Sequence, residues 1–230
     1  MTSLRNFALI VFALIVVADA ARHDAATNSA RAPHSQSSPA SSAKIWEPPT
    51  AEFGESIPNA TVPKKMVSKI TVSGSPVVLE KTSLAEIAAR FGATAGHRGD
   101  AGDSVQWLCF RGTDPGGDWV LWLESYEIDG GTVGGFQWQR VGSATVFDGR
   151  CRMLAGKSVE LPDRLRLGLT KEEVKTILGE PTVWRGDTAV YVHGHTESIR
   201  GERFTSQNVV EFLFRDGKTQ AIRASKTTTD

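Results

Sequence analysis

Hydrophobic residues recur at helical spacing in two short stretches of the chain, residues 81–94 (KTSLAEIAARFGAT) and residues 168–182 (GLTKEEVKTILGEPT). The apolar positions are Leu84, Ile87, Ala88 and Phe91 in the first stretch, and Val174, Ile177 and Leu178 in the second. Positions three and four apart lie on one face of a helix. Each stretch therefore predicts a short amphipathic helix, too short to be stable without a sheet to cover its apolar face.

The boundary residues of the two stretches also agree. Each begins with a hydroxyl residue followed three positions later by glutamate, the capping box that satisfies two unpaired backbone N–H groups of a helix start. Each ends at a glycine, which adopts the left-handed backbone that follows many helices. The box pairs are Ser83 with Glu86 and Thr170 with Glu173, and the glycines are Gly92 and Gly179. The matching order predicts an internal repeat.

Runs rich in β-branched and aromatic residues follow each helix. They are Val105–Arg111, Trp119–Ile128 and Val133–Arg140 after the first, and Ala189–His193, Val209–Arg215 and Thr219–Ala224 after the second. Asp129-Gly130 and Asp216-Gly217 separate neighbouring runs, and Asp-Gly is a strong hairpin signal. The sequence therefore predicts an α+β fold with two tandem helix-plus-three-stranded-antiparallel-sheet units, residues 67–153 and 154–226.

The first part of the chain predicts export. Arg5 precedes an apolar run from Phe7 to Val17, and Ala18-Asp19-Ala20 has the small-x-small form of a signal peptidase site. Residues 1–20 are thus interpreted as a signal peptide, with an uncleaved anchor as the alternative. Residues 21–66 are rich in Ala, Ser and Pro and have no hydrophobic periodicity, which predicts a disordered linker. We expect a periplasmic or secreted protein with no integral membrane span after processing.

Composition and motifs narrow the functional class. The 26 basic and 26 acidic residues cancel, so no net field favours binding to nucleic acid. The chain has no nucleophile elbow, phosphate loop or metalloprotease motif. His193 and His195 fall on the same face of a strand, which brings two possible metal ligands together, but an ion-free histidine pair is the simpler interpretation. We therefore predict no catalytic residues, no metal site and no cofactor.

Cys109 and Cys151 are the two cysteines of the chain. An even number of cysteines in an exported protein favours a disulfide. Two unpaired buried thiols are the alternative.

Residues 168–182 resemble the signature of the SmpA/OmlA family of outer-membrane assembly lipoproteins, and residues 82–94 match it more loosely. The resemblance covers roughly residues 75–225, and the tandem arrangement is similar to the β-lactamase inhibitory protein-like fold. It implies helix-on-sheet units and a role in envelope assembly. The lipid-attachment cysteine of the lipoproteins is missing from this chain, and no contact residue is carried over by any motif.

Alternation along the strands sorts their residues onto two faces. The apolar face, expected beneath the helices, contains Leu108, Phe110, Leu121, Leu123, Val190, Val192, Phe212, Phe214 and Ile222. The opposite face contains the candidate protein-binding residues Trp107, Arg111, Trp122, Glu124, Tyr126 and Tyr191. Tryptophan, tyrosine and arginine are enriched at binding hot spots. The alternative is that these tryptophans pack against a loop or the neighbouring unit, and Trp138 fits either face.

The sequence as a whole thus predicts an exported protein-binding module, with inhibitors and immunity-type proteins within that class. Its partner would be another protein, gripped across the open face of the sheet. The alternative is a structural or assembly factor of the bacterial cell envelope.

Overall fold

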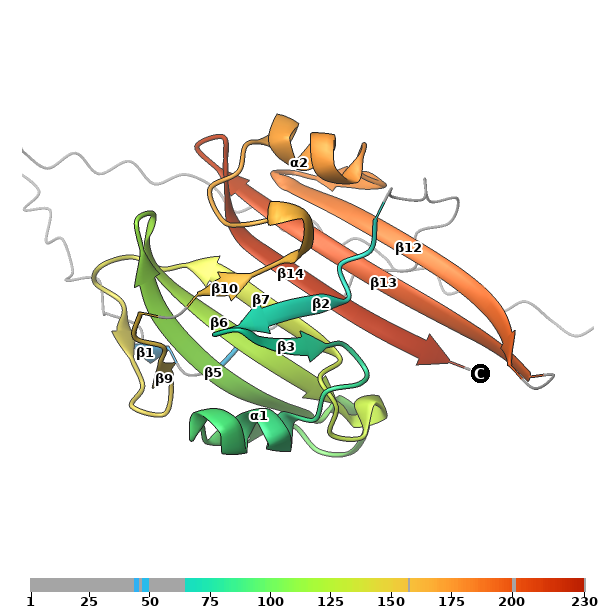
Figure 1. Ribbon diagram of the computed structural model, residues 1–230, viewed down its shortest axis with the longest axis horizontal. Coiled ribbons are helices and arrows are strands. Elements are labelled where there is room, and N and C mark those ends of the chain that lie inside the picture. The colour runs from blue at the N-terminus through green and yellow to red at the C-terminus, as the bar shows by residue number, and fades with distance from the viewer. Residues whose placement is uncertain (1–43, 46, 50–64, 157, 200–201, 230) are drawn as a thin grey trace, which may run out of the picture. The chain divides into compact units, whose positions relative to one another are not determined.

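One continuous antiparallel sheet dominates the computed structural model, which describes residues 44–45, 47–49, 65–156, 158–199 and 202–229 (Figure 1). Its strand order is β11-β12-β13-β14-β7-β6-β5-β4, and β9 pairs with β5 in parallel. The strands are β4 (Ala95–Arg98), β5 (Val105–Asp114), β6 (Gly117–Tyr126), β7 (Gly135–Arg140), β9 (Arg152–Met153), β11 (Val183–Arg185), β12 (Thr188–Ile199), β13 (Glu202–Arg215) and β14 (Lys218–Thr229).

Smaller elements accompany this sheet. A three-stranded sheet has the order β10-β2-β3, and β1 pairs with β8 in parallel. These strands are β1 (Lys44–Ile45), β2 (Lys69–Val72), β3 (Ser75–Val78), β8 (Val146–Phe147) and β10 (Val159–Glu160). The α-helices of the described residues are α1 (Leu84–Phe91) and α2 (Lys171–Leu178), and the 3-10 turns are η1 (Ala101–Asp103), η2 (Glu127–Asp129) and η3 (Pro162–Arg164).

The fold class expected from the sequence, α+β with two tandem helix-plus-three-stranded-sheet units, is wrong. The described chain is β-rich, and each of its two α-helices has only eight residues. The strands of the second half are far longer than expected, with 12 residues in β12 and 14 in β13. The strands of both halves also join through the β14–β7 pairing, so a single sheet replaces the two separate ones.

The expected domain limits fall partly outside the described residues. The predicted signal peptide, residues 1–20, lies there, as does most of the predicted linker. Within that linker, however, Lys44–Ile45 forms strand β1 beside Val146–Phe147. Ser41–Asp230 forms one compact unit, and the large sheet continues across the expected boundary at residues 153 and 154.

The helix boundaries follow the sequence closely. Thr170 accepts a hydrogen bond from the Glu173 N–H at 3.2 Å, and the Glu173 carboxylate accepts one from the Thr170 N–H at 2.7 Å, which confirms the capping box of α2. At α1, the Ser83 hydroxyl accepts from the Ala85 N–H at 3.1 Å, so a simple N-cap replaces the capping box expected with Glu86. Gly92 ends α1 in the left-handed backbone region, which glycine adopts without steric cost.

Both helices and the three-stranded sheet contribute to one hydrophobic core on a single face of the large sheet (Figure 1). Leu84 and Ile87 of α1 and Val174 and Leu178 of α2 are buried in it. The helices are therefore stabilised by packing rather than by their length.

The strand faces agree with the expected alternation except on β12. Leu108, Phe110, Leu121, Leu123, Phe212, Phe214 and Ile222 belong to this core, as expected. On β12, Tyr191 belongs to the core while Val190 pairs with Glu211, so this strand presents the opposite face from the one predicted. The valines and the tyrosine of this strand are all apolar enough to be buried, and alternation alone did not choose between them.

Leu178→Ala tests the packing of α2. Leu178 is only 1% exposed, so its truncation should lower the free energy of unfolding by about 2–5 kcal/mol. The matched control is Glu172→Ala, at an exposed position of the same helix. A surface substitution of this kind should change the free energy of unfolding by less than about 0.5 kcal/mol. Chemical denaturation measures both, and equal effects would contradict the packing described.

Candidate functional site

Trp107 and Trp122, expected as exposed anchors, lie on the sheet face opposite the helices but are buried. Both side chains are 0% exposed. They form a second hydrophobic cluster with Val105, Cys109, Val120 and Cys151, against which Ile45, Tyr126, Val141 and Phe147 pack. The predicted face was right and the predicted exposure was wrong; the alternative, that a loop covers these tryptophans, is confirmed.

The covering segment, residues 141–153, is here called the strap. It is fastened to β5 by the Cys109–Cys151 disulfide, which confirms the predicted bond, and by the parallel pairing of β9 with β5. Phe147 of the strap lies over the Arg111 guanidinium, 5.0 Å from it to the ring centroid. Arg111, another predicted binding residue, is thus held beneath the strap.

Removing the disulfide should loosen the strap. The bond closes a loop with a sequence separation of 42, for which the chain-entropy model gives about 4 kcal/mol of stabilisation. The double variant Cys109→Ala/Cys151→Ala should lose about that much unfolding free energy, and acrylamide should quench its tryptophan fluorescence more strongly. Wild-type quenching in the variant would show that the strap covers Trp107 and Trp122 without the bond.

Glu124 and Tyr126 belong to a buried polar network on the same face. The Tyr126 hydroxyl donates to Glu124 Oε2 at 2.5 Å, and Arg223 Nη1 donates to Glu211 Oε2 at 3.3 Å. Arg223 also hydrogen-bonds to Tyr126, which links the two pairs. Burial raises the pKa of Glu124, and the hydrogen bond from Tyr126 and the charge of Arg223 offset this in part. Glu124 is therefore a structural member of the network rather than a surface contact.

Glu124→Gln tests how far the buried carboxylate of Glu124 lowers the stability of the folded chain. The pKa of Glu124 is higher in the folded chain than its ordinary value of 4.5. Folded stability is therefore greatest below the ordinary pKa and falls as pH rises through the raised one. The variant should melt higher than wild type at pH 7, because it has no carboxylate to ionise in the buried site. Its melting temperature should also vary less with pH.

Asp129 keeps its own pH dependence in that variant, since burial raises its pKa to about 6. Thermal melts from pH 4 to pH 8 measure both effects. A variant that melts lower than wild type at pH 7, with the same pH dependence, would contradict this account of Glu124.

Tyr191, the remaining predicted binding residue, lies in the main core beside Phe212, with ring centroids 5.8 Å apart. Its hydroxyl donates to the Gly179 carbonyl at 3.2 Å, which ties β12 to the end of α2. The structure therefore does not bring the six predicted binding residues to one exposed surface. Within the described residues, no group of three or more His, Cys, Asp and Glu side chains is arranged to hold a metal ion.

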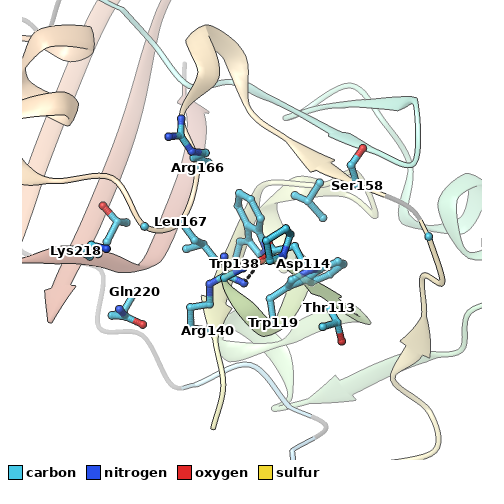
Figure 2. A pocket seen from close by; sticks show the side chains of 16 residues that line it. Thr113, Asp114, Trp119, Trp138, Arg140, Ser158, Arg166, Leu167, Lys218 and Gln220 are labelled. Carbon is cyan, nitrogen blue, oxygen red and sulfur yellow. Dashed lines mark hydrogen bonds and ion pairs between the residues drawn. The ribbon is translucent and has the colours of Figure 1, made fainter. Parts of the chain in front are cut away.

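An open cleft of about 740 Å³ lies instead at one end of the junction between β7 and β14 (Figure 2). The residues around it come from the β5–β6 turn, β6, β7, the segment 156–168 and the start of β14. They are Thr113, Asp114, Pro115, Gly116, Trp119, Trp138, Arg140, Gly156, Ser158, Val159, Arg166, Leu167, Gly168, Lys218, Thr219 and Gln220.

The β5–β6 turn builds one wall of the cleft. Asp114 Oδ1 accepts hydrogen bonds from the Gly116 N–H and from Arg140 Nη1, each at 2.7 Å, and Arg140 Nη1 also donates to the Gly117 carbonyl at 2.8 Å. A Cβ added to Gly116 would lie 2.3 Å from Arg140 Nη2, so glycine makes room for the guanidinium. The turn thus holds Arg140 in a fixed position.

The segment Leu165–Leu169, which turns at Leu167 and Gly168, builds the facing side. Leu165, Leu167 and Leu169 are buried, so the residues between them, Arg166 and Gly168, are exposed. The Gly168 N–H donates to the Thr219 carbonyl and the Thr219 N–H to the Leu169 carbonyl, both at 2.8 Å. This pairing carries Arg166 and the exposed Lys218 to the rim of the cleft (Figure 2).

Trp119 and Trp138 line the cleft as an aromatic pair, with ring centroids 6.4 Å apart in an edge-to-face arrangement. A Cβ on Gly112 would lie 2.3 Å from Trp119 Cζ2, so this glycine lets the indole lie against β5. The Trp138 Nε1–H is buried and has no acceptor among the described residues, a cost of about 1–3 kcal/mol. The alternation of β6 could have placed Trp119 on the core face, but no sequence signal indicated the cleft.

The functional assignment rests on this geometry. No family model, curated protein or solved structure matches the chain. In the part of the chain that the structure describes, the helices are all too short or too polar to cross a membrane.

Proposed function

We propose that this chain is an exported protein-binding module and that it binds its partner through the cleft. The observation that carries the proposal is the cleft itself, whose rim carries the exposed cations Arg166 and Lys218. Arginine is one of the residue types that contribute most often to protein-binding hot spots. The burial of Trp107 and Trp122 removes the competing surface on the other face.

The chemistry of the lining favours binding over catalysis. Asp114 is the only carboxylate among the described lining residues, and Arg140 and Gly116 already engage it. General acid–base catalysis needs a group that is free to exchange a proton with the substrate. Asp114 serves instead to fix the position of Arg140.

Export is supported by the disulfide, because such bonds persist in oxidising compartments. Together with the predicted signal peptide, it supports a periplasmic or secreted location. Inhibition of a partner enzyme is a function within this class. A role in envelope assembly, which the resemblance to the SmpA/OmlA lipoproteins implies, would use the same cleft with a membrane-associated partner.

Ser158→Trp should block the cleft. Ser158 is exposed and lines the cleft, so an indole there fills part of the volume that a partner would occupy. A partner isolated from the envelope or culture fluid with the mature protein should bind this variant at least tenfold more weakly, roughly 1.4 kcal/mol. Isothermal titration calorimetry measures the affinity, and thermal melting should show unchanged stability.

Ser198→Trp is the matched control, since Ser198 is an exposed serine on β12 that does not line the cleft. It should bind the partner as wild type does. Equal binding by both variants would contradict the cleft as the site. Failure of the wild-type protein to retain any partner would contradict the function.

A further inference from the structure

We infer that the cleft receives an acidic segment of the partner protein, with an aspartate or glutamate carboxylate seated against Arg166 and Lys218. This inference rests on the proposed function and specifies the chemistry of the partner. Charge and the fixed position of Arg140 support it.

The lining of the cleft carries more positive than negative charge, unlike the chain as a whole. The chain is neutral, with 26 basic and 26 acidic residues, whereas the described lining contains the three cations Arg140, Arg166 and Lys218 and the one carboxylate Asp114. Asp114 forms its ion pair with Arg140 at 2.7 Å. Arg166 and Lys218 therefore carry the positive charge that no carboxylate of the lining pairs with.

A carboxylate of the chain itself does lie within the influence of these two cations. The pKa of Glu173 is lowered, first by the hydrogen bond from the Thr170 N–H and then also by the charges of Arg166 and Lys218. Glu173 is committed to the capping box of α2, however. With one carboxylate beside two cations, a net positive charge remains.

The wall of the cleft is formed before a partner binds. Asp114 and the Gly117 carbonyl hold the Arg140 guanidinium, so this side chain needs no ordering on binding. Trp119, Trp138 and Leu167 line the cleft but are buried in the main core, so they fix its shape. The accessible charges of Arg166 and Lys218 thus lie on a preformed wall, which matches an acidic segment.

Titration with a hexaglutamate peptide, followed by tryptophan fluorescence at low salt, tests the charge preference. The mature wild-type protein should bind hexaglutamate at least about tenfold more tightly than hexaglutamine or hexalysine, and added salt should weaken binding by screening. Arg166→Glu/Lys218→Glu should abolish the preference. The control Lys81→Glu/Arg203→Glu makes the same change in net charge at exposed positions outside the cleft and should keep it.

Three results would overturn the inference. One is equal binding of hexaglutamate and hexaglutamine by the wild-type protein. Another is equal loss of binding in the two charge-reversed variants, which would make the preference a property of net charge. Binding of succinate as tight as that of hexaglutamate would also contradict it, because the site would then fit a small anion rather than a protein segment.

Photo-crosslinking separates this inference from the proposed function. A benzoylphenylalanine placed at position 220, where Gln220 lines the cleft, would be crosslinked to the partner, and the joined peptide identified by mass spectrometry. An acid-rich joined segment supports both proposals. A neutral or basic joined segment overturns the charge inference but leaves the binding module standing. Crosslinks that appear only from a control probe at position 198 overturn both.

Discussion

The antiparallel pairing of β7 with β14 is the constraint on which the rest of this structure depends. It runs from Ser225 opposite Gly135 to Ala221 opposite Gln139 and joins strands from the two halves of the chain into one sheet. A Cβ at Gly135 would lie 3.1 Å from the Ala224 carbonyl oxygen, so glycine permits this close contact. Beyond this paired stretch the two strands contribute Arg140 and Lys218 to the cleft, which makes the candidate site a consequence of how the halves meet.

Local features of this fold could be predicted from the sequence because short-range chemistry determines them. The Thr170 capping box, the tight turn at Asp216-Gly217 and the disulfide all follow from residues whose conformational or redox preferences are strong. At that turn both Asp216 and Gly217 have positive φ, as an Asp-Gly hairpin requires. The fold class was wrong because no local signal shows that two sets of strands hydrogen-bond to each other.

The candidate site could not be predicted from the sequence, for a related reason. Strand alternation placed Trp107 and Trp122 on the correct face, but it carries no information about the strap, which follows them in the chain and folds back over them. The cleft combines Trp138 with Arg166 and Lys218, residues far apart in sequence that only the tertiary structure brings together. A surface-like composition on one face of a strand therefore predicts an interface only where no other segment of the chain covers that face.

The central claim is that the partner contacts the cleft rather than the strap-covered face, and hydrogen–deuterium exchange of the complex tests it most directly. On binding, backbone amides of residues 113–119 and 165–168 and of the start of β14 should become protected, while those of the strap, residues 141–153, should exchange as in the free protein. New protection confined to the strap, with exchange around the cleft unchanged, would contradict the claim.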